Sequence, residues 1–238
     1  MFIVDQIVNL DRHIATALNA LAGQSTILNR LAVSLSEANW LKVTPFVLVA
    51  AWFWNSEPKI ANRKDVANGF VGIALALLLN RLLQLALPFR PRPIHDAALG
   101  LSLPAGLSLD ILGGWSSFPS DHAAIFAALV GLVMPLSRRL AWAGVGYALL
   151  FVLLPRLYLG IHYVSDITVG FAIGAAGSWI AHRRPLASLV GPSVERLARI
   201  HPAAFYTVGL LLLTQVVQMF GDVRRYSSIA KGLLAGTL

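Results

Sequence analysis

Long apolar runs separated by short polar segments are the main pattern of this chain. A helix that crosses a membrane needs about 20 mostly apolar residues, because each residue adds only about 1.5 Å to its length. The runs predict an all-α integral membrane protein, built as a bundle of six spanning helices. The third run is short, and we expect its helix to extend back into the preceding loop. The predicted spans are 31–54, 66–87, 121–136, 140–158, 162–181 and 203–221.

The N-terminal segment 1–25 has a different pattern. Its apolar residues recur at helical spacing, and the charged residues Asp5, Asp11 and Arg12 interrupt them. We therefore expect an amphipathic helix, with no cleavable signal peptide. A helix lying on the membrane surface and a helix packed on the bundle are equally good interpretations. The apolar positions are Phe2, Ile3, Ile7, Leu10, Ile14, Leu18 and Leu21.

Composition supports the membrane interpretation. Of the 238 residues, 57% are hydrophobic and 13% are charged, whereas about 25% are charged in soluble domains. The chain has no cysteine, which excludes disulfides and thiolate metal sites. Cationic loops beside the spans explain the net charge of +8 better than nucleic-acid binding does. We expect one domain over 1–238, with the core spans and motif loops in 66–182 and the last span and tail in 203–238.

The basic residues predict an orientation. Nine of the 19 Lys and Arg residues fall in alternate linkers, which the positive-inside rule places in the cytoplasm. The loop 88–120 and the boundary at 156–162 then face the outside of the cell, as do both termini. Three basic residues of the tail, Arg224, Arg225 and Lys231, fall on the wrong side for the rule. The nine are Lys59, Arg63, Lys64, Arg138, Arg139, Arg183, Arg184, Arg196 and Arg199.

Three polar clusters share the predicted outer face. They are the Arg-Pro-Arg-Pro run 90–93, the Pro-Ser-Asp-His run 119–122, and the segment 156–166, which contains an arginine, a histidine and an aspartate. Each has an ordinary explanation by itself: a headgroup anchor, a helix cap or a hydrated interface histidine. Their convergence on one face favours a site that handles phosphate.

Arginine and a helix N-terminus both suit phosphate. The guanidinium presents a planar fork of donors to phosphate oxygens, which makes Arg90, Arg92 and Arg156 candidate ligands. Ser120 can cap the helix that follows it, and the amides of that first turn can bind an anion.

The two histidines and the aspartate suit proton and phosphoryl transfer. His162 and Asp166 are four residues apart, which predicts that they share one face of a helix. A neutral His162 can attack phosphorus, while Asp166 fixes its tautomer and stabilises positive charge on the ring. His122 can donate a proton to a leaving oxygen. Because no Asp-rich cluster suited to Mg²⁺ is present, we expect no metal and no cofactor.

These residues resemble the motifs of the type 2 phosphatidic acid phosphatase superfamily, which are Lys-x6-Arg-Pro, Pro-Ser-x-His and Ser-Arg-x5-His-x3-Asp. The resemblance covers about residues 66–182 and implies a helical bundle with a metal-independent site at the membrane surface. It also implies that His162 attacks phosphorus and forms a phosphohistidine, that Asp166 supports it, and that His122 protonates the leaving group. The phosphate would be held by Arg92, Ser120 and Arg156.

The chain departs from the family pattern at two positions. The lysine expected seven residues before Arg92 is Leu85, and the serine expected before Arg156 is Pro155. Neither change touches the nucleophile or the acid, so we still expect activity. The sequence leaves three candidates for the missing donor, Arg81, Gln84 and Arg90, of which Arg90 is nearest to Arg92 in the chain.

The Pro-Ser-Asp-His and Arg-Pro-Arg-Pro runs are similar to those of the undecaprenyl-diphosphatase branch. That likeness implies removal of the terminal phosphate from a C55 isoprenyl diphosphate at the outer face of a bacterial cytoplasmic (inner) membrane, in support of peptidoglycan synthesis. Phosphatidylglycerol phosphate, phosphatidic acid and lipid A phosphate are alternative substrates. A lipid phosphotransferase and a non-catalytic lipid-phosphate transporter are alternative functions. The expected partners are the lipid substrate and the bilayer, without nucleic acid, and the oligomeric state is open.

Overall fold

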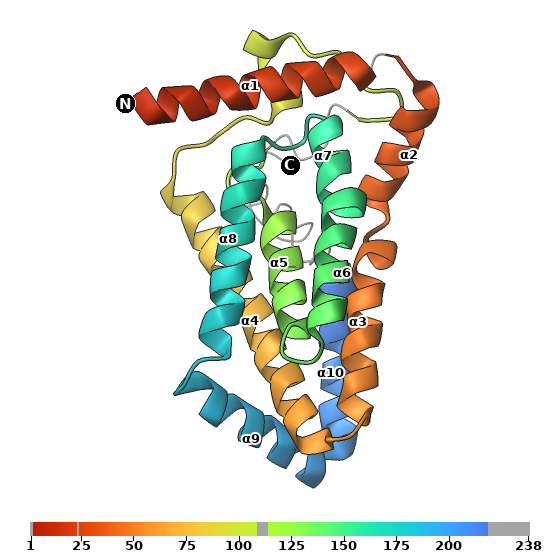
Figure 1. Ribbon diagram of the computed structural model, residues 1–238, viewed down its shortest axis with the longest axis vertical. Coiled ribbons are helices and arrows are strands. Elements are labelled where there is room, and N and C mark those ends of the chain that lie inside the picture. Colours follow the sequence, from red (N-terminus) through yellow and green to blue (C-terminus); the bar gives the residue numbers. More distant parts are fainter. Residues whose placement is uncertain (1, 23, 109–113, 219–238) are drawn as a thin grey trace, which may run out of the picture.

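A computed structural model of the chain describes residues 2–22, 24–108 and 114–218, and all regular structure in these ranges is helical. The all-α prediction is therefore confirmed for the described residues. One helix lies across one end of the bundle and another lies at the opposite end (Figure 1). These two are α1 (Phe2–Ala22) and α9 (Leu186–Ile200). The bundle contains α2 (Thr26–Glu37), α3 (Asn39–Asn55), α4 (Lys59–Ala86), α5 (Asp121–Val133), α6 (Arg138–Ala148), α7 (Leu154–Tyr158), α8 (Val164–Ala181) and α10 (Pro202–Val217), with a π-helical segment at Leu149–Leu153 and 3-10 turns at Pro93–His95 and Ala97–Leu99.

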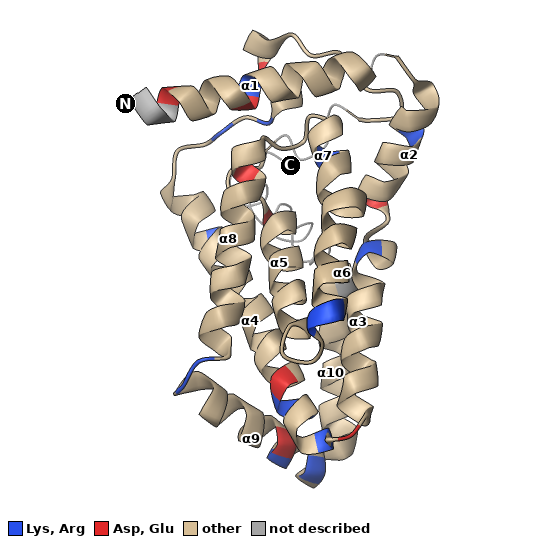
Figure 2. Cartoon of the chain, in the orientation of Figure 1, with Lys and Arg blue, Asp and Glu red and all other residues tan. Residues whose placement is uncertain are grey.

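Three helical segments of the described chain are long and apolar enough to cross a membrane. They are α4, the continuous segment Arg138–Tyr158, and α8, while α5 and α10 are shorter apolar helices. Charged residues lie mainly towards the two ends of the bundle, with few between them (Figure 2). The count of six spans stays a prediction. The last predicted span, 203–221, and the tail to residue 238 continue beyond the described residues.

Two predicted span boundaries are wrong. The run 31–54 is not one helix, because α2 ends at Glu37 and α3 begins at Asn39, with Ala38 between them at φ −72° and ψ 69°. Apolar residues continue on both sides of this break, so hydropathy alone merges the two helices. α5 does not extend back into the loop either, because the Ser120 hydroxyl accepts a hydrogen bond from Ala123 N at 3.4 Å and caps the helix there.

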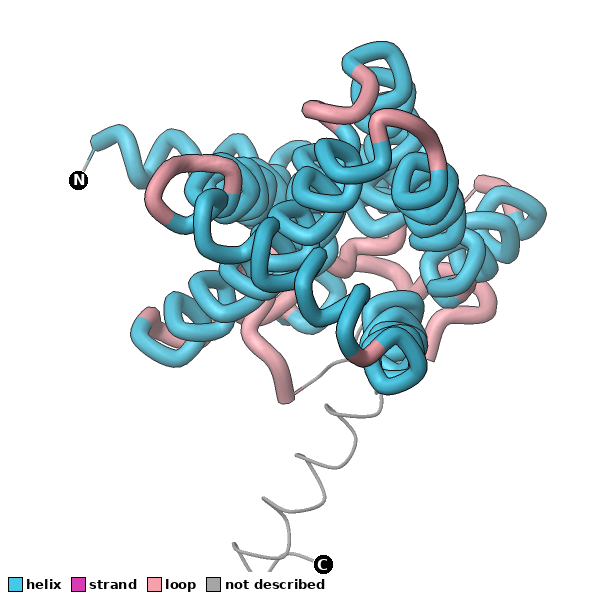
Figure 3. The backbone as a smooth tube through the Cα atoms, turned by 90° about the horizontal axis from the view of Figure 1, so that it is seen from below, coloured by secondary structure: helices cyan, strands magenta, loops and turns pink. Residues whose placement is uncertain are grey.

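Helix α1 contacts the bundle through small and polar side chains. Asp11 and Ala15 are buried on that face. The larger apolar side chains of Ile7, Leu10 and Leu21 are about half exposed on the outside of the molecule. Seen from the end of the bundle, the N-terminal helix projects beyond the other helices (Figure 3). Its contact with a membrane surface stays a prediction.

Helix α5 lies at the centre of the bundle and packs against α4 and α8, which also pack against each other. Nearly all of its residues are buried. Two glycines of α8 allow the backbones to approach closely, because a Cβ on Gly170 would overlap the Ser120 carbonyl and one on Gly174 would overlap the Ala124 carbonyl. This contact holds the second and third turns of α8 beside the start of α5.

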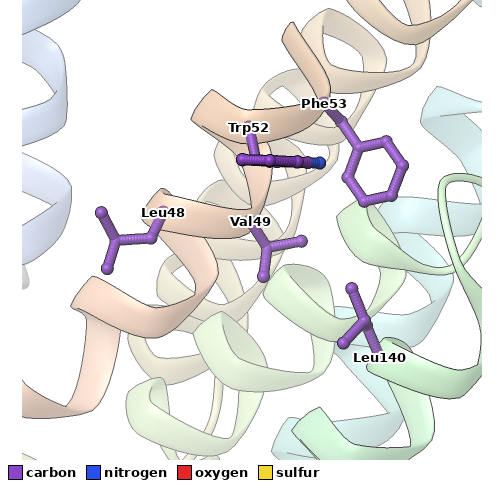
Figure 4. A pocket seen from close by; sticks show the side chains of 5 residues that line it. All are labelled: Leu48, Val49, Trp52, Phe53 and Leu140. Atoms are coloured by element: carbon purple, nitrogen blue, oxygen red, sulfur yellow. The ribbon is translucent and has the colours of Figure 1, made fainter. Parts of the chain in front are cut away.

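An apolar groove of about 400 Å³ opens between α3 and α6 (Figure 4). Its lining is Leu48, Val49, Trp52, Phe53 and Leu140, and it contains none of the residues of the three polar clusters. Such a surface suits contact with hydrocarbon rather than with phosphate.

Candidate active site

The three polar clusters meet at the end of the bundle that α1 covers. Main-chain hydrogen bonds join them directly, so their relative position does not depend on side chains alone. The Arg-Pro run and the residue after it are bonded to the segment before the Pro-Ser run and to the segment 156–166, and the Pro-Ser run is bonded to the start of α8. These bonds are Ile94 N to Gly160 O at 2.9 Å, Ser117 N to Arg90 O at 2.9 Å, and Ser120 N to Asp166 O at 3.1 Å.

The prediction that His162 and Asp166 share a helix face is wrong. His162 lies in the turn between α7 and α8, because α8 begins only at Val164. Gly160 makes this turn with a φ of +67°, a conformation that favours glycine. Asp166 is in the first turn of α8, where its side chain accepts a hydrogen bond from Tyr163 N at 2.8 Å. The turn nevertheless brings His162 Nδ1 to 3.6 Å from Asp166 Oδ2.

The hydrogen bonds of His162 fix its tautomer. Nδ1 lies 3.0 Å from the Ser117 carbonyl oxygen, and a carbonyl can only accept, so Nδ1 carries the proton. Nε2 therefore has its lone pair available, and Arg92 Nη1 lies 3.3 Å from it. Burial lowers the pKa of His162 to about 4. The positive charges of Arg92 and Arg156 also lower this pKa, whereas Asp166 raises it. The ring is neutral and can act as a nucleophile.

Arg92 is held beside this nitrogen. Its side chain is buried, and Nη1 also donates to the Ile161 carbonyl at 2.9 Å. A guanidinium fixed in this way places positive charge where a phosphate would meet the His162 ring.

Arg156 lies next to the second histidine. Its Nη2 contacts His122 Nε2, and because a guanidinium only donates, His122 Nε2 is the acceptor in this state. Both side chains are buried. The π-helical segment Leu149–Leu153 comes directly before α7, whose second residue, Pro155, has no N–H to continue the α-helical bonding.

Arg90 lies on the far side of Asp166. Its Nη1 donates to Asp166 Oδ1 at 2.7 Å and to Ser165 Oγ at 2.8 Å, and its Nη2 donates to Asp11 Oδ2 at 2.8 Å. The guanidinium also lies 4.0 Å from the ring centroid of Tyr163. Arg90 thus links two carboxylates, and its predicted contact with phosphate stays a prediction.

Two residues of this network were missed by the sequence reasoning. Asp11 of α1 is 2% exposed and also accepts a hydrogen bond from Ser165 N at 3.0 Å. Ser117 is fully buried; its hydroxyl donates to Asp166, and its carbonyl accepts from His162. No motif pointed to either, although Asp11 interrupts an otherwise apolar repeat.

Two of the candidates for the missing lysine, Arg81 and Gln84, contact Asp121. Leu85 is 73% exposed. Arg81 Nη2 is 3.3 Å from Asp121 Oδ2, and Gln84 Nε2 is 3.1 Å from Asp121 Oδ1. Asn80 Nδ2 also donates to Asp121 Oδ1, at 2.7 Å. These side chains of α4 anchor the Pro-Ser-Asp-His run through its aspartate.

Within the described ranges, no group of three or more His, Cys, Asp or Glu side chains is arranged as a metal site would require. The expectation of metal-independent chemistry stays a prediction.

Comparison with known proteins adds family evidence. Two strains of Mycobacterium tuberculosis have a decaprenylphosphoryl-5-phosphoribose phosphatase that is 36% identical over 115 residues, which is 46% of this chain and 52% of the relative. The lipid A 4'-phosphatase of Bacteroides thetaiotaomicron is 37% identical over 82 residues, which is 30% of this chain and 34% of the relative. The chain thus spans about half the length of the mycobacterial relative and about a third of the length of the Bacteroides relative. No solved structure gives a significant match.

The family model of the PAP2 superfamily matches residues 65–188, a range that contains all three polar clusters and the helices that carry them. This match extends over more than half of the chain, and His122, His162 and Asp166 lie within the matched residues. The chain therefore belongs to the PAP2 superfamily.

Proposed function

We propose that this protein is a membrane phosphatase of lipid phosphates, with His162 as its nucleophile. The observation that carries the proposal is the state of the buried His162 ring, whose unprotonated Nε2 lies 3.3 Å from Arg92 Nη1. A neutral imidazole beside a fixed guanidinium suits attack on a phosphate monoester or anhydride.

In the first step, His162 Nε2 attacks phosphorus while the bond from phosphorus to the leaving oxygen breaks. Arg92 and Arg156 neutralise the phosphoryl oxygens and orient phosphorus for in-line attack. His122 protonates the leaving oxygen. Because Arg156 donates to His122 Nε2 in the structure, we infer that a phosphate bound by Arg156 draws it away and lets this nitrogen take up a proton.

In the second step, water attacks the phosphohistidine, the N–P bond breaks, and inorganic phosphate leaves. His122 accepts the proton from water, and His162 returns to its neutral state. Asp166 stabilises the positive ring of the intermediate through Nδ1, which lies 3.6 Å from Asp166 Oδ2. The Ser117 carbonyl keeps the same proton on Nδ1 throughout.

Substitution of the nucleophile tests the mechanism. His162→Asn should reduce phosphate release by at least about 10⁴-fold, because the covalent route has no substitute. Thermal unfolding in detergent should show that the variant is folded. Trapping of a ³²P-labelled histidine in the wild type, and its absence from the variant, would complete the test. A folded variant with near-normal phosphate release would refute the proposal.

For the substrate, we propose a polyprenyl-linked phosphate at the outer face of a bacterial inner membrane. The motif runs favour undecaprenyl diphosphate. The printed name of the mycobacterial relative, a decaprenylphosphoryl-5-phosphoribose phosphatase, supports the polyprenyl class more generally. Lipid A phosphate is the second candidate, because of the Bacteroides relative.

A phosphate-release panel without added metal would separate these substrates. It would compare undecaprenyl diphosphate, decaprenylphosphoryl-5-phosphoribose, lipid A, phosphatidylglycerol phosphate and phosphatidic acid. A kcat/KM for either polyprenyl substrate at least tenfold above the others would support the proposal. A preference for lipid A or a glycerolipid would overturn the substrate class but leave the phosphatase proposal intact.

A further inference from the structure

Lys42 is a buried cation that the proposed mechanism does not use. It lies in the first turn of α3 and is 1% exposed, in a stretch of α3 where Val43 and Phe46 belong to the apolar core. A charged side chain in such a position within a membrane protein marks a candidate functional site, because its burial is costly unless polar or ionic groups surround it.

The break between α2 and α3 gives Lys42 its position. Its Nζ donates to the main-chain carbonyl of Ser36 at 2.6 Å. Ser36 lies in the last turn of α2, where carbonyls have no partner within the helix and the helix dipole favours cations. A continuous helix through residue 38 would bond this carbonyl internally.

The same carbonyl oxygen connects Lys42 to the candidate active site. Arg156 Nη2 donates to Ser36 O at 3.2 Å and contacts His122 Nε2. Two nitrogens bonded to one oxygen are close enough to bind one phosphate group together. Lys42 therefore lies beside Arg156, next to the proposed proton donor.

We infer that Lys42 is a phosphate ligand, which binds with Arg156 on the His122 side of the site. The inference rests on the proposed function, since it deepens the description of the same site. It places the third cation of the site on α3, outside the range 65–188 that the family model matches. Leu85 stands where the family pattern has its lysine. It is 73% exposed, and its aliphatic side chain has no donor for phosphate.

The ammonium group would donate to a phosphate oxygen as charge develops near the leaving group. Arg92 would then bind from the loop after α4 and Lys42 from α3, with Arg156 between the nucleophile and the acid. A point charge with rotatable donors can follow an oxygen as the phosphorus moves in-line, which a fixed guanidinium does less easily.

The experiment compares Lys42→Met, Lys42→Gln and Lys42→Arg in the full chain purified in detergent. Lys59→Met is the matched control, because Lys59 is an exposed lysine at the first residue of α4. The measurements are KM and kcat for the lipid that the wild type hydrolyses best, and the inhibition constants of inorganic phosphate and orthovanadate. Thermal unfolding shows whether each variant is folded. If Lys42→Met does not fold, Lys42→Gln replaces it in the test, because its amide can still donate to Ser36 O.

Removal of the charge should raise KM and both inhibition constants by about tenfold or more, because one charge-assisted hydrogen bond to phosphate is lost. Lys42→Arg should restore most of this loss, and Lys59→Met should resemble the wild type. A folded Lys42→Met or Lys42→Gln variant with wild-type constants would overturn the inference.

Failure of the proposed function would look different. If the wild type hydrolyses no lipid phosphate, orthovanadate binding measured by calorimetry still reports on Lys42. Binding that weakens in Lys42→Gln and not in Lys59→Met would support the phosphate contact without the activity. Equal binding in all variants, or none in the wild type, would count against it.

Discussion

At the scale of the residue, the state of His162 follows from two hydrogen bonds and its burial. The Ser117 carbonyl requires a proton on Nδ1, and Arg92 excludes one from Nε2, since a guanidinium only donates. Burial is the largest cause of the lowered pKa, which falls to about 4 from 6.5. The nucleophilic nitrogen is therefore unprotonated across the whole physiological pH range.

This state can be observed directly. In protein labelled with ¹⁵N-histidine, the His162 signal should show the Nδ1–H tautomer and should titrate near pH 4. The signal is identified by its absence from the His162→Asn spectrum. A midpoint near 6.5 would contradict the assignment.

The same shift predicts how acid affects the folded protein. Between pH 6.5 and about 4, His162 takes up a proton in the unfolded chain but not in the folded chain. The free energy of unfolding should therefore fall as the pH decreases through this window. The fall should be smaller in His162→Asn.

At the scale of the element, α1 is part of the site as well as its cover. Asp11 and Asp166 bind the same guanidinium, that of Arg90, from opposite nitrogens. Asp11 also bonds Ser165 at the start of α8. The helix thus fixes Arg90 and, through it, the carboxylate next to His162.

Asp11 is therefore expected to be a positioning residue. Asp11→Asn should lower kcat by about tenfold and change KM by less than about twofold, because the residue supports Asp166 rather than phosphate. Asp5→Asn is the matched control, since Asp5 is an exposed aspartate of the same helix. Equal kcat values for the two variants would contradict this role.

The close contact between α5 and α8 gives a second prediction at this scale. Gly174→Ala should destabilise the protein by about 1–3 kcal/mol, because the new Cβ overlaps the Ala124 carbonyl. Gly146→Ala in α6 is the control; its Cβ meets nothing within 4 Å, and the helix should gain up to about 1 kcal/mol. Thermal unfolding in detergent measures both. A Gly174→Ala variant as stable as Gly146→Ala would show that the helices can separate without cost.

At the scale of the whole molecule, the predicted orientation can be tested by labelling. The chain has no cysteine, so single cysteines report one position each. Ala97→Cys lies on the exposed loop at the end that holds the site, and Lys59→Cys lies towards the opposite end. On intact bacteria, a membrane-impermeant maleimide should label Ala97→Cys, and should label Lys59→Cys only after the cells are permeabilised. The reverse pattern would place the site in the cytoplasm.

Much of the fold was predictable because hydrophobic periodicity reports helices well. The helices α4, α6 to α7, and α8 lie close to their predicted ranges. The errors came where local hydrogen bonding ends a helix inside an apolar or loop region. Ala38 and Ser120 are such positions, and hydropathy carries no signal for either.

The sequence by itself determined the helical class, the three polar clusters and the types of residue that suit phosphoryl transfer, because these depend on composition and spacing. Only the tertiary structure decided which atoms meet. It placed His162 in a turn rather than on a helix, directed Arg90 towards Asp11 and Asp166, and brought Lys42 to Arg156 through one carbonyl. These contacts join residues far apart in the chain, so they depend on how the helices pack and where each one ends.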